Sequence, residues 1–277
     1  PKLRKVFEEN KIDAVMNFAG FKSVGESVAK PLDYYENNVS GAVGLLKTMK
    51  EFNVKKFIFS SSATVYGDPE VVPITEDCKT GGTTNPYGTT KLFIEQILKD
   101  LYKSDSDWDI AILRYFNPVG SHETGLIGEE PKGVPNNLMP YIVRVAAGEL
   151  AQLSVFGNDY DTPDGTGVRD YIHVVDLSKG HLKALDKLDR EGKGLFIYNL
   201  GTGKGYSVLD MIKAFEESTG QEVNYKIVGR REGDIATCYA DPTKAKNELG
   251  WETEKSLRDM CRDSWLYIQT AKGMKQK

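Results

Sequence analysis

The stretch Lys56-Phe57-Ile58-Phe59-Ser60-Ser61-Ser62 changes from apolar to hydroxyl side chains within one short segment. Its first half is typical of a buried strand, and its second half offers hydrogen-bond donors and acceptors. In an open parallel sheet, ligands bind beyond the carboxyl ends of the strands. We therefore expect the serines to lie at a sheet edge where a substrate binds.

A second stretch, Tyr87-Gly88-Thr89-Thr90-Lys91, opens a helical pattern that follows this strand. On a helix, Tyr87 and Lys91 are four residues apart and share one face. An ammonium at that distance favours the phenolate, so we expect the pKa of Tyr87 to fall below its usual value of about 10. A hydroxyl, a phenol and an ammonium together can move a proton on and off a substrate alcohol. The alternative is an ordinary Tyr–Lys pair on a helix surface.

The surrounding pattern alternates between strands and helices. Strands are predicted at 12–18, 56–62 and 110–114, with helices from Pro31 and over 87–103, which is typical of a parallel α/β sheet. After Asn117-Pro118 a polar, Gly- and Pro-rich loop runs to Asn137. Beyond it we predict helices at 138–147, 175–188 and 207–218, strands at 153–156, 170–173, 196–199 and 223–228, and two closing helices. We therefore predict two domains, 1–118 with a doubly wound sheet and 119–277 with a smaller α/β fold.

Composition excludes several classes of protein. The 277 residues carry a net charge of −4 without long runs of one sign, which argues against a nucleic-acid or membrane surface. Cys78, Cys238 and Cys261 are odd in number and far apart, which favours a reducing cytoplasm over a disulfide framework. The three histidines lack metal-ligand spacing, and no segment has the apolar length of a membrane span.

A glycine-rich nucleotide fingerprint does not open this chain. Gly201-Thr202-Gly203-Lys204-Gly205 departs from the fingerprint spacing, so we interpret it as a tight turn that feeds a capped helix rather than a phosphate cradle. The sequence begins at Pro1, within a helical pattern, which indicates a truncated first βαβ unit.

Several motifs occur together in one order: Asn17-Phe18-Ala19-Gly20, Ser60 through Gly67, Tyr87 to Lys91, Arg114-Tyr115-Phe116-Asn117-Pro118, residues 133–138, residues 165–174 and residues 230–234. The ordered set resembles the extended short-chain dehydrogenases that act on sugar nucleotides, and among them the UDP-glucose 4-epimerases. The match covers essentially the whole chain and lacks only the family's N-terminal glycine-fingerprint segment. The resemblance implies an NAD-binding Rossmann-like domain followed by a UDP-sugar-binding domain.

The resemblance also implies a mechanism that serves galactose metabolism. Tyr87 takes the proton from the 4-hydroxyl of the sugar while tightly bound NAD accepts the C4 hydride, and hydride then returns to the other face of the 4-keto sugar. This interconverts UDP-galactose and UDP-glucose. Lys91 lowers the pKa of Tyr87 and bonds the nicotinamide ribose, and Ser62 bridges the 4-hydroxyl, with Thr64 as a helper. Most other hydroxyls in the serine run are expected to cap backbone groups.

The same resemblance implies two sets of ligand contacts. Those to NAD are Phe18, Ala19, Gly20, Lys22, Asn37, Ser60, Tyr87, Lys91 and Phe116. Those to the UDP-sugar are Ser62, Tyr87, Asn117, Asn137, Leu138, Phe156, Arg169, Arg231, Asp234 and Cys238. Arginines suit a pyrophosphate because they form bidentate, charge-assisted bonds. We expect His173 to be structural.

Cys238 occupies a position where some bacterial relatives carry a bulky Tyr. We hypothesise that the pocket has room for a 2-N-acetyl group, so that UDP-GlcNAc and UDP-GalNAc also interconvert. The alternative is that Cys238 is simply a small buried residue.

Three further expectations concern the whole chain. A homodimer is expected, because two predicted helices carry apolar residues beyond one face. A sugar-nucleotide dehydratase or decarboxylase is a second possible function, although those enzymes place an acidic residue where this chain has Ala63-Thr64-Val65. A third is a non-catalytic sensor of NAD or nucleotide sugars. A chain without the first βαβ unit is expected to bind NAD poorly and to aggregate.

Overall fold

The main sheet contains four parallel strands in the order β1-β2-β3-β7. The computed structural model describes residues 2–131, 133 and 135–273, so Pro1 and Val134 of the motifs above lie outside the described residues. The strands are β1 (Val15–Asn17), β2 (Lys56–Ser62), β3 (Asp109–Tyr115) and β7 (Gly194–Leu200). The predicted parallel α/β fold class is therefore confirmed.

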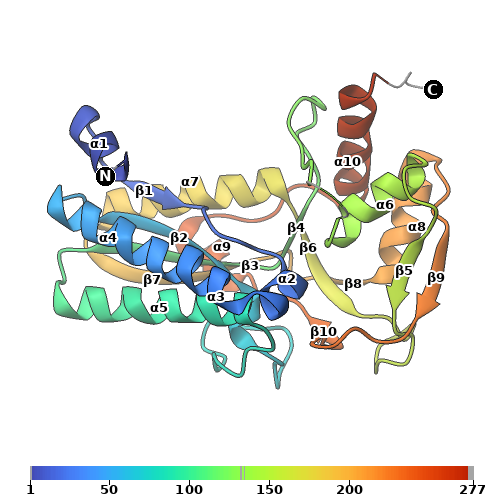
Figure 1. Ribbon diagram of the computed structural model, residues 1–277, viewed down its shortest axis with the longest axis horizontal. Helices are drawn as coiled ribbons and strands as arrows, with labels where there is room; N and C mark the ends of the chain where they lie inside the picture. The colour runs from blue at the N-terminus through green and yellow to red at the C-terminus, as the bar shows by residue number, and fades with distance from the viewer. Residues whose placement is uncertain (1, 132, 134, 274–277) are drawn as a thin grey trace.

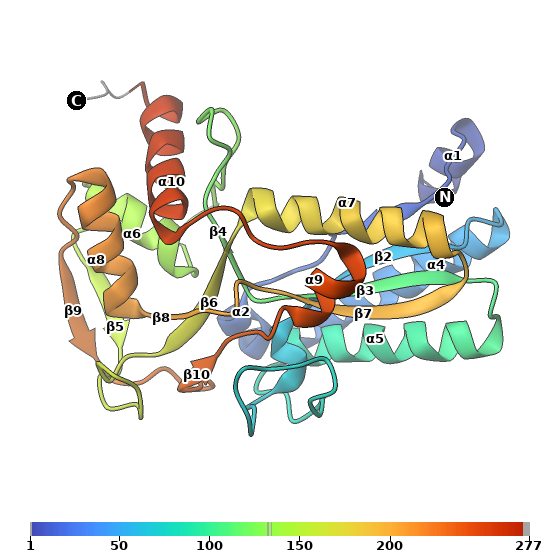
Figure 2. The same cartoon turned by 180° about the vertical axis from the view of Figure 1, so that it is seen from behind.

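Helices cover both faces of this sheet (Figures 1 and 2). One face packs against α1 (Lys2–Glu9), α4 (Gly41–Glu51) and α5 (Pro86–Ser104), with Phe57, Phe59 and Leu98 in its core. The other face packs against α7 (Val174–Glu191) and α9 (Thr243–Leu249), around Ile58 and Leu113. Successive residues of β2 thus alternate between the two cores, as the period of a strand requires.

A second part of the molecule lies beyond the carboxyl edge of the sheet (Figure 1). There α6 (Leu138–Ala146), α8 (Val208–Thr219) and α10 (Leu257–Ala271) pack together with the parallel pair β5 (Leu153–Phe156) and β9 (Tyr225–Val228). Between the two parts, β6 (Val168–His173) pairs with β10 (Thr237–Cys238), β4 (Asn117–Val119) and β8 (Gly205–Ser207).

The helix predicted from Pro31 contains an irregular turn. It consists of α3 (Pro31–Tyr34), a π-helical turn over Tyr35–Ser40, and α4. Asn38 in this turn is buried, and its amide bonds the backbone N–H and C=O of Phe21 and the hydroxyl of Thr90. The short helix α2 (Val24–Ala29), the 3-10 turn Ala63–Tyr66 and the strands β4, β8 and β10 were not predicted from the sequence.

The proposed division at residue 118 does not separate the two parts in space. Strand β7 and helix α7 follow residue 118 in the chain but belong to the main sheet and its covering layer. The parts are joined further by the segment near Ile74, which bonds the backbone of Tyr239 and Asp241. The division stays a prediction about sequence ranges.

Candidate active site

Tyr87 lies in the first turn of α5, beside the serines that end β2. Asn85 caps this helix by accepting a hydrogen bond from Gly88 N at 2.9 Å, and Pro86 occupies its first position, where a missing N–H costs nothing. The backbone is close to its neighbour at position 88, where a Cβ would lie 3.2 Å from Cβ of Thr64. This close approach brings the start of α5 against the turn that follows Ser62.

Ser62 is buried, and its hydroxyl oxygen accepts from Thr64 N at 3.2 Å and from Thr64 Oγ1 at 3.0 Å. It therefore caps the 3-10 turn, a role that was expected for the other hydroxyls of this run rather than for Ser62. It also stabilises the ionised form of Tyr87 through a hydrogen bond. The structure thus brings Ser62, Thr64 and Tyr87 together at the carboxyl edge of the main sheet.

Lys91 is buried one helical turn after Tyr87. Its Nζ donates to the carbonyl oxygen of Ser60 at 2.7 Å and lies 5.0 Å from the ring centre of Phe59 and 5.8 Å from that of Tyr87. Burial lowers the pKa of Lys91 to about 8. The ammonium is therefore tied to strand β2.

The predicted fall in the pKa of Tyr87 is wrong for the chain alone. The pKa of Tyr87 is raised, because removal of the phenolate from water outweighs the stabilising hydrogen bond from Ser62. Lys91 does not offset this burial, since its ammonium is held by the Ser60 carbonyl. A bound group that brings positive charge to this edge would lower the pKa again.

The segment predicted to hold NAD follows β1 at the same edge. Phe18, Ala19, Gly20, Lys22 and Asn37 are exposed there. A Cβ at Gly20 would lie 3.3 Å from Oδ1 of Asn38, so the backbone here runs close to the π-helical turn.

Three of the residues assigned to NAD have other surroundings. Asn37 donates its amide to Oδ1 of Asn38 at 2.9 Å, and Lys22 pairs with Glu129 at 2.9 Å. Phe116 is buried in the small core around Val65 and Tyr66. The exposed segment from Phe18 to Lys22 is therefore more accessible to a dinucleotide than the buried side chain of Phe116.

The residues assigned to the UDP-sugar form two groups. In the first, Arg231 forms a bidentate pair with Asp234 at 3.1 and 2.8 Å and lies 5.4 Å from the ring centre of exposed Phe156. An aromatic face, a guanidinium and a carboxylate thus meet at one surface, a set that suits a base, a phosphate and ribose hydroxyls.

The second group lies along β6. Arg169 is paired in register with Cys238 on one side, and Tyr171 with Asn117 on the other. Cys238 is 8% exposed, and burial raises the pKa of its thiol to about 11, which makes it a small buried residue and a poor nucleophile. Asn137 and Leu138 stand apart, at the start of α6.

The turn at Gly201–Gly205 is occupied by a protein carboxylate. Asp170 is fully buried, and it accepts from the backbone N–H of Thr202, Gly203 and Ala240 and from the Thr202 hydroxyl, at 2.6–3.1 Å. These N–H groups are therefore already hydrogen-bonded within the protein, which supports the prediction of a tight turn over a phosphate cradle. The capped helix predicted after it is present, with a capping box between Ser207 and Asp210.

His173 is structural, as predicted. It is fully buried, accepts from Val175 N at 3.1 Å through Nδ1, and donates from Nε2 to Asp263 at 3.2 Å. Burial lowers the pKa of this imidazole against the opposing effect of Asp263. Both ring nitrogens are thus engaged at the start of α7.

Tyr115 and His181 lie close to the site but were not predicted as site residues. The Tyr115 hydroxyl contacts Nε2 of His181, whose Nδ1 donates to the Leu177 carbonyl, and the His181 ring lies 4.8 Å from that of Phe18. Burial raises the pKa of the Tyr115 phenol. The sequence signal was available, since Tyr115 is within a quoted motif at the end of a predicted strand.

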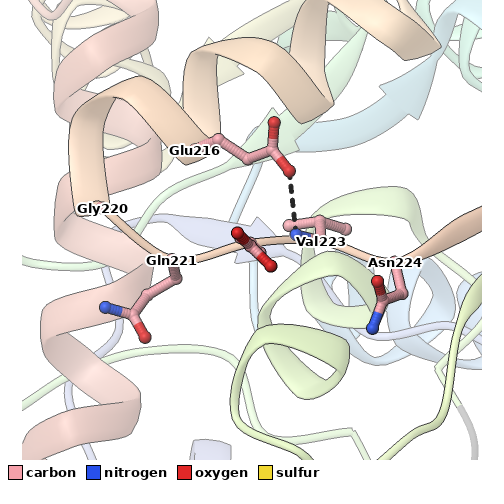
Figure 3. Close-up of a pocket in the computed structure, with 6 residues that line it drawn as sticks. Glu216, Gly220, Gln221, Val223 and Asn224 are labelled. Atoms are coloured by element: carbon pink, nitrogen blue, oxygen red, sulfur yellow. Dashed lines mark hydrogen bonds between the residues drawn. The ribbon is translucent and has the colours of Figure 1, made fainter.

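A surface hollow of about 450 Å³ lies far from this edge, at the end of α8 (Figure 3). In it the carboxylate of Glu216 accepts from Val223 N at 2.9 Å, so this side chain holds the local backbone. It does not include any of the predicted site residues; its lining is Glu216, Gly220, Gln221, Glu222, Val223 and Asn224.

Comparison with known proteins identifies the family. Residues 1–264 match a family model described as GDP-mannose 4,6 dehydratase. The UDP-glucose 4-epimerase of Pasteurella multocida is 64% identical over 263 residues, which cover 95% of this chain and 78% of that protein. The chain belongs to the UDP-glucose 4-epimerase family. The human member of the family is 57% identical over 263 residues, covering 95% of this chain and 75% of that protein.

Solved structures of the UDP-glucose 4-epimerase family agree. The epimerase of Bifidobacterium longum, solved in complex with NAD+ and UDP, has a TM-score of 0.94 and 60% identity, over 98% of this chain and 80% of that one. The predicted family and enzyme class are thereby confirmed, and the dehydratase and sensor alternatives are not favoured. Among the described residues, no helix has both the length and the apolar character needed to span a bilayer.

Proposed function

We propose that the chain interconverts UDP-galactose and UDP-glucose by epimerisation at C4, with NAD as a recycling cofactor. The observation that carries this proposal is the convergence of Ser62, Tyr87 and Lys91 at one sheet edge, in a chain 57–64% identical to UDP-glucose 4-epimerases. The identity of the relatives supports an epimerase over the dehydratase for which the matching family model is named.

The chain's own residues handle the proton. The Tyr87 phenol, with the Ser62 hydroxyl beside it, exchanges a proton with the 4-hydroxyl of the sugar. Lys91 anchors the helix to the Ser60 carbonyl and places an ammonium under this edge. Bound NAD would supply the hydride acceptor and donor for C4 of the sugar. We assign its binding to Phe18, Ala19, Gly20, Lys22, Asn37, Ser60 and Phe116.

The UDP part of the substrate is assigned to the surface beyond the edge. Phe156 supports the base, Arg169 and Arg231 neutralise the pyrophosphate, and Asp234 accepts from the ribose. The loop that carries Arg231 and Asp234 approaches Thr84, just before α5, since Gly233 faces Thr84 O. This supports a substrate that extends from Phe156 toward Tyr87. We assign further contacts to Asn117 and Cys238, and to Asn137 and Leu138 at the start of α6.

Three finer points belong to this proposal. Phe93 on α5 is 47% exposed and packs against Tyr35, which supports a homodimer formed through this helix layer. The three free cysteines support a reducing, cytoplasmic location. We also propose that small Cys238 admits N-acetylated UDP-sugars, while weak retention of NAD stays a prediction.

The direct test is to incubate the chain with UDP-galactose and excess NAD, and to separate the products while following NADH absorbance. We expect UDP-glucose to form without net NADH. A dehydrated or decarboxylated product would contradict the proposal, and so would the absence of any product when NAD is bound. Light scattering of Phe93→Glu against the parent tests the dimer, which the variant should weaken.

A further inference from the structure

A buried ion pair lies directly behind the serine strand. Glu95 on α5 is fully buried, and Arg114 on β3 is 1% exposed. Arg114 donates to both carboxylate oxygens of Glu95, from Nε at 3.0 Å and from Nη2 at 2.7 Å. The pair lies between helix and sheet, on the face of the sheet where Phe57, Phe59 and Leu98 form an apolar core.

The pair is part of a network that reaches across the sheet. Ser61 of β2 donates to Oε1 of Glu95 at 2.6 Å. On the other side, Arg114 Nη1 donates to the Tyr66 hydroxyl at 2.8 Å, which in turn donates to Oδ1 of Asn199 on β7 at 2.6 Å. One connected set of bonds thus joins α5, three strands and the turn that follows Ser62.

Stability alone is a weak reason for such a pair. Two charges lose their hydration when they are buried, and apolar residues of similar size are often as stable or more so. The geometry offers a second reason. Tyr87, Lys91 and Glu95 are spaced by four residues, so they form one stripe of α5.

The stripe meets β2 at adjacent residues. Lys91 bonds the carbonyl of Ser60, and Glu95 bonds the hydroxyl of Ser61. These two polar bonds fix how far α5 slides and rotates along the strand, which apolar contacts do less strictly. Tyr87 belongs to the same stripe, one helical turn before Lys91, and Ser62 directly follows Ser61 on the same strand.

We propose that Glu95 and Arg114 are positioning residues, which hold the Tyr87 end of α5 in register with Ser62 for the reaction. The inference rests on the proposed function, because it names the role of these residues in that reaction. Neither side chain touches the substrate edge, since both are buried below it.

The first test uses Ser61→Ala, which removes one bond of the network and leaves the ion pair in place. We expect kcat to fall roughly tenfold while KM stays within about twofold, because a small displacement of a reacting group slows the chemical step. The matched control is Ser264→Ala. Ser264 is also buried and bonds the Met260 carbonyl at 2.8 Å, but on α10, and its loss should leave kcat unchanged.

The second test replaces the pair with apolar residues, Glu95→Leu together with Arg114→Met. We expect a folded protein with a melting temperature at or above that of the parent, and a kcat reduced about a hundredfold. Parental kcat in this folded double variant would overturn the proposal. If the double variant does not fold, Ser61→Ala decides: parental kcat overturns the proposal and a selective fall in kcat supports it.

A third measurement separates this proposal from the proposed function. The phenolate titration of Tyr87, obtained by subtracting the spectrum of Tyr87→Phe, reports the geometry without any turnover. We expect the titration to move to higher pH in Ser61→Ala, because Ser62 no longer meets the phenol well. An unchanged titration would count against the positioning role even if the parent shows no epimerase activity, a result that would refute the proposed function separately.

Discussion

Lys91 Nζ donates to the carbonyl oxygen of Ser60 at 2.7 Å, so the ammonium is anchored to the strand rather than to the phenol one helical turn away. This contact separates two roles that the spacing of Tyr87 and Lys91 had suggested were one. Lys91 sets the helix against the strand, and the Ser62 hydroxyl is the group that stabilises the phenolate.

Tyr87→Phe removes the proposed acid–base group and keeps the ring. We expect kcat to fall by a factor of about 10² to 10⁴, as for the loss of a general base, with little effect on UDP binding. Steady-state kinetics and calorimetric titration with UDP measure the two effects. A variant that retained most of its kcat would show that another group, such as Tyr115, moves the proton.

Lys91→Met should stabilise the protein while it abolishes activity. Burial lowers the pKa of Lys91 from 10.5 to about 8, so the unfolded chain binds this proton more tightly. Stability of the parent therefore rises with pH between about 8 and 10.5. At pH 7 we expect the variant to be more stable by about 2 kcal/mol, after allowance for the lost bond to Ser60.

Urea unfolding of Lys91→Met and the parent across this pH range measures the difference. The difference in free energy of unfolding should shrink toward zero above pH 10.5, apart from the effect of the changed packing. A variant less stable than the parent at every pH would contradict the assigned cause of the shift.

Asp109→Asn should also stabilise the protein, through a group that titrates in acid rather than in alkaline solution. Asp109 is buried at the start of β3, its Oδ1 has no partner among the described residues, and burial raises its pKa to about 6. The native state therefore binds the proton more tightly, and the stability this contributes is lost as pH rises from about 4 to about 6. We expect a gain of roughly 1 kcal/mol at pH 7 that disappears near pH 4.

A neighbouring carboxylate provides the control for Asp109. Lys193 lowers the pKa of exposed Asp107, so its small contribution is present at neutral pH and lost in acid. Asp107→Asn should therefore slightly destabilise at pH 7. The same direction of change in both variants would contradict the electrostatic explanation.

Asp170→Asn should raise KM more than it lowers kcat. Oδ2 of Asp170 accepts from the N–H groups of Gly203 and Ala240, and an amide NH2 in its place cannot accept. We expect β10 and Cys238 to shift, with KM up about tenfold and a loss of about 2–4 kcal/mol in stability. Asp176→Asn is the control. This buried carboxylate also accepts two backbone N–H bonds, from Glu254 and Lys255, but at a place away from the site.

Cys238→Tyr tests the width of the pocket. If the small thiol admits an N-acetyl group, the parent should convert UDP-GlcNAc, and the variant should lose that activity at least tenfold while it keeps UDP-galactose. Competition between the two sugars in one reaction gives the ratio directly. No conversion of UDP-GlcNAc by the parent would refute this prediction.

Periodicity predicted the scaffold well. Strand Lys56–Ser62 and the helix from Pro86 were expected within one residue of where they begin, because each has one strong pattern and a clear cap. The π-turn at Asn38 was not predicted, and the buried Asn38 within it bonds Phe21, which is distant in the chain. Local propensity does not contain such a contact.

The polar interior was predicted less well. Glu95 and Arg114 have the charge of surface residues, and only the fold reveals that they pair in the core. The predicted fall in the pKa of Tyr87 was wrong for a related reason. Spacing indicated that Lys91 was near, but desolvation and the competing Ser60 carbonyl depend on tertiary structure.

The place of β7 in the main sheet affects how the chain is made. Residues 56–115, with Ser62 and Tyr87, leave the ribosome long before Gly194–Leu200 can pair with β3. Until then the N–H and C=O groups along the free edge of strand Asp109–Tyr115 are unpaired, so this edge can pair wrongly with strands of other nascent chains. The reactive edge is therefore synthesised early, but the sheet that supports it closes only after most of the polypeptide has emerged.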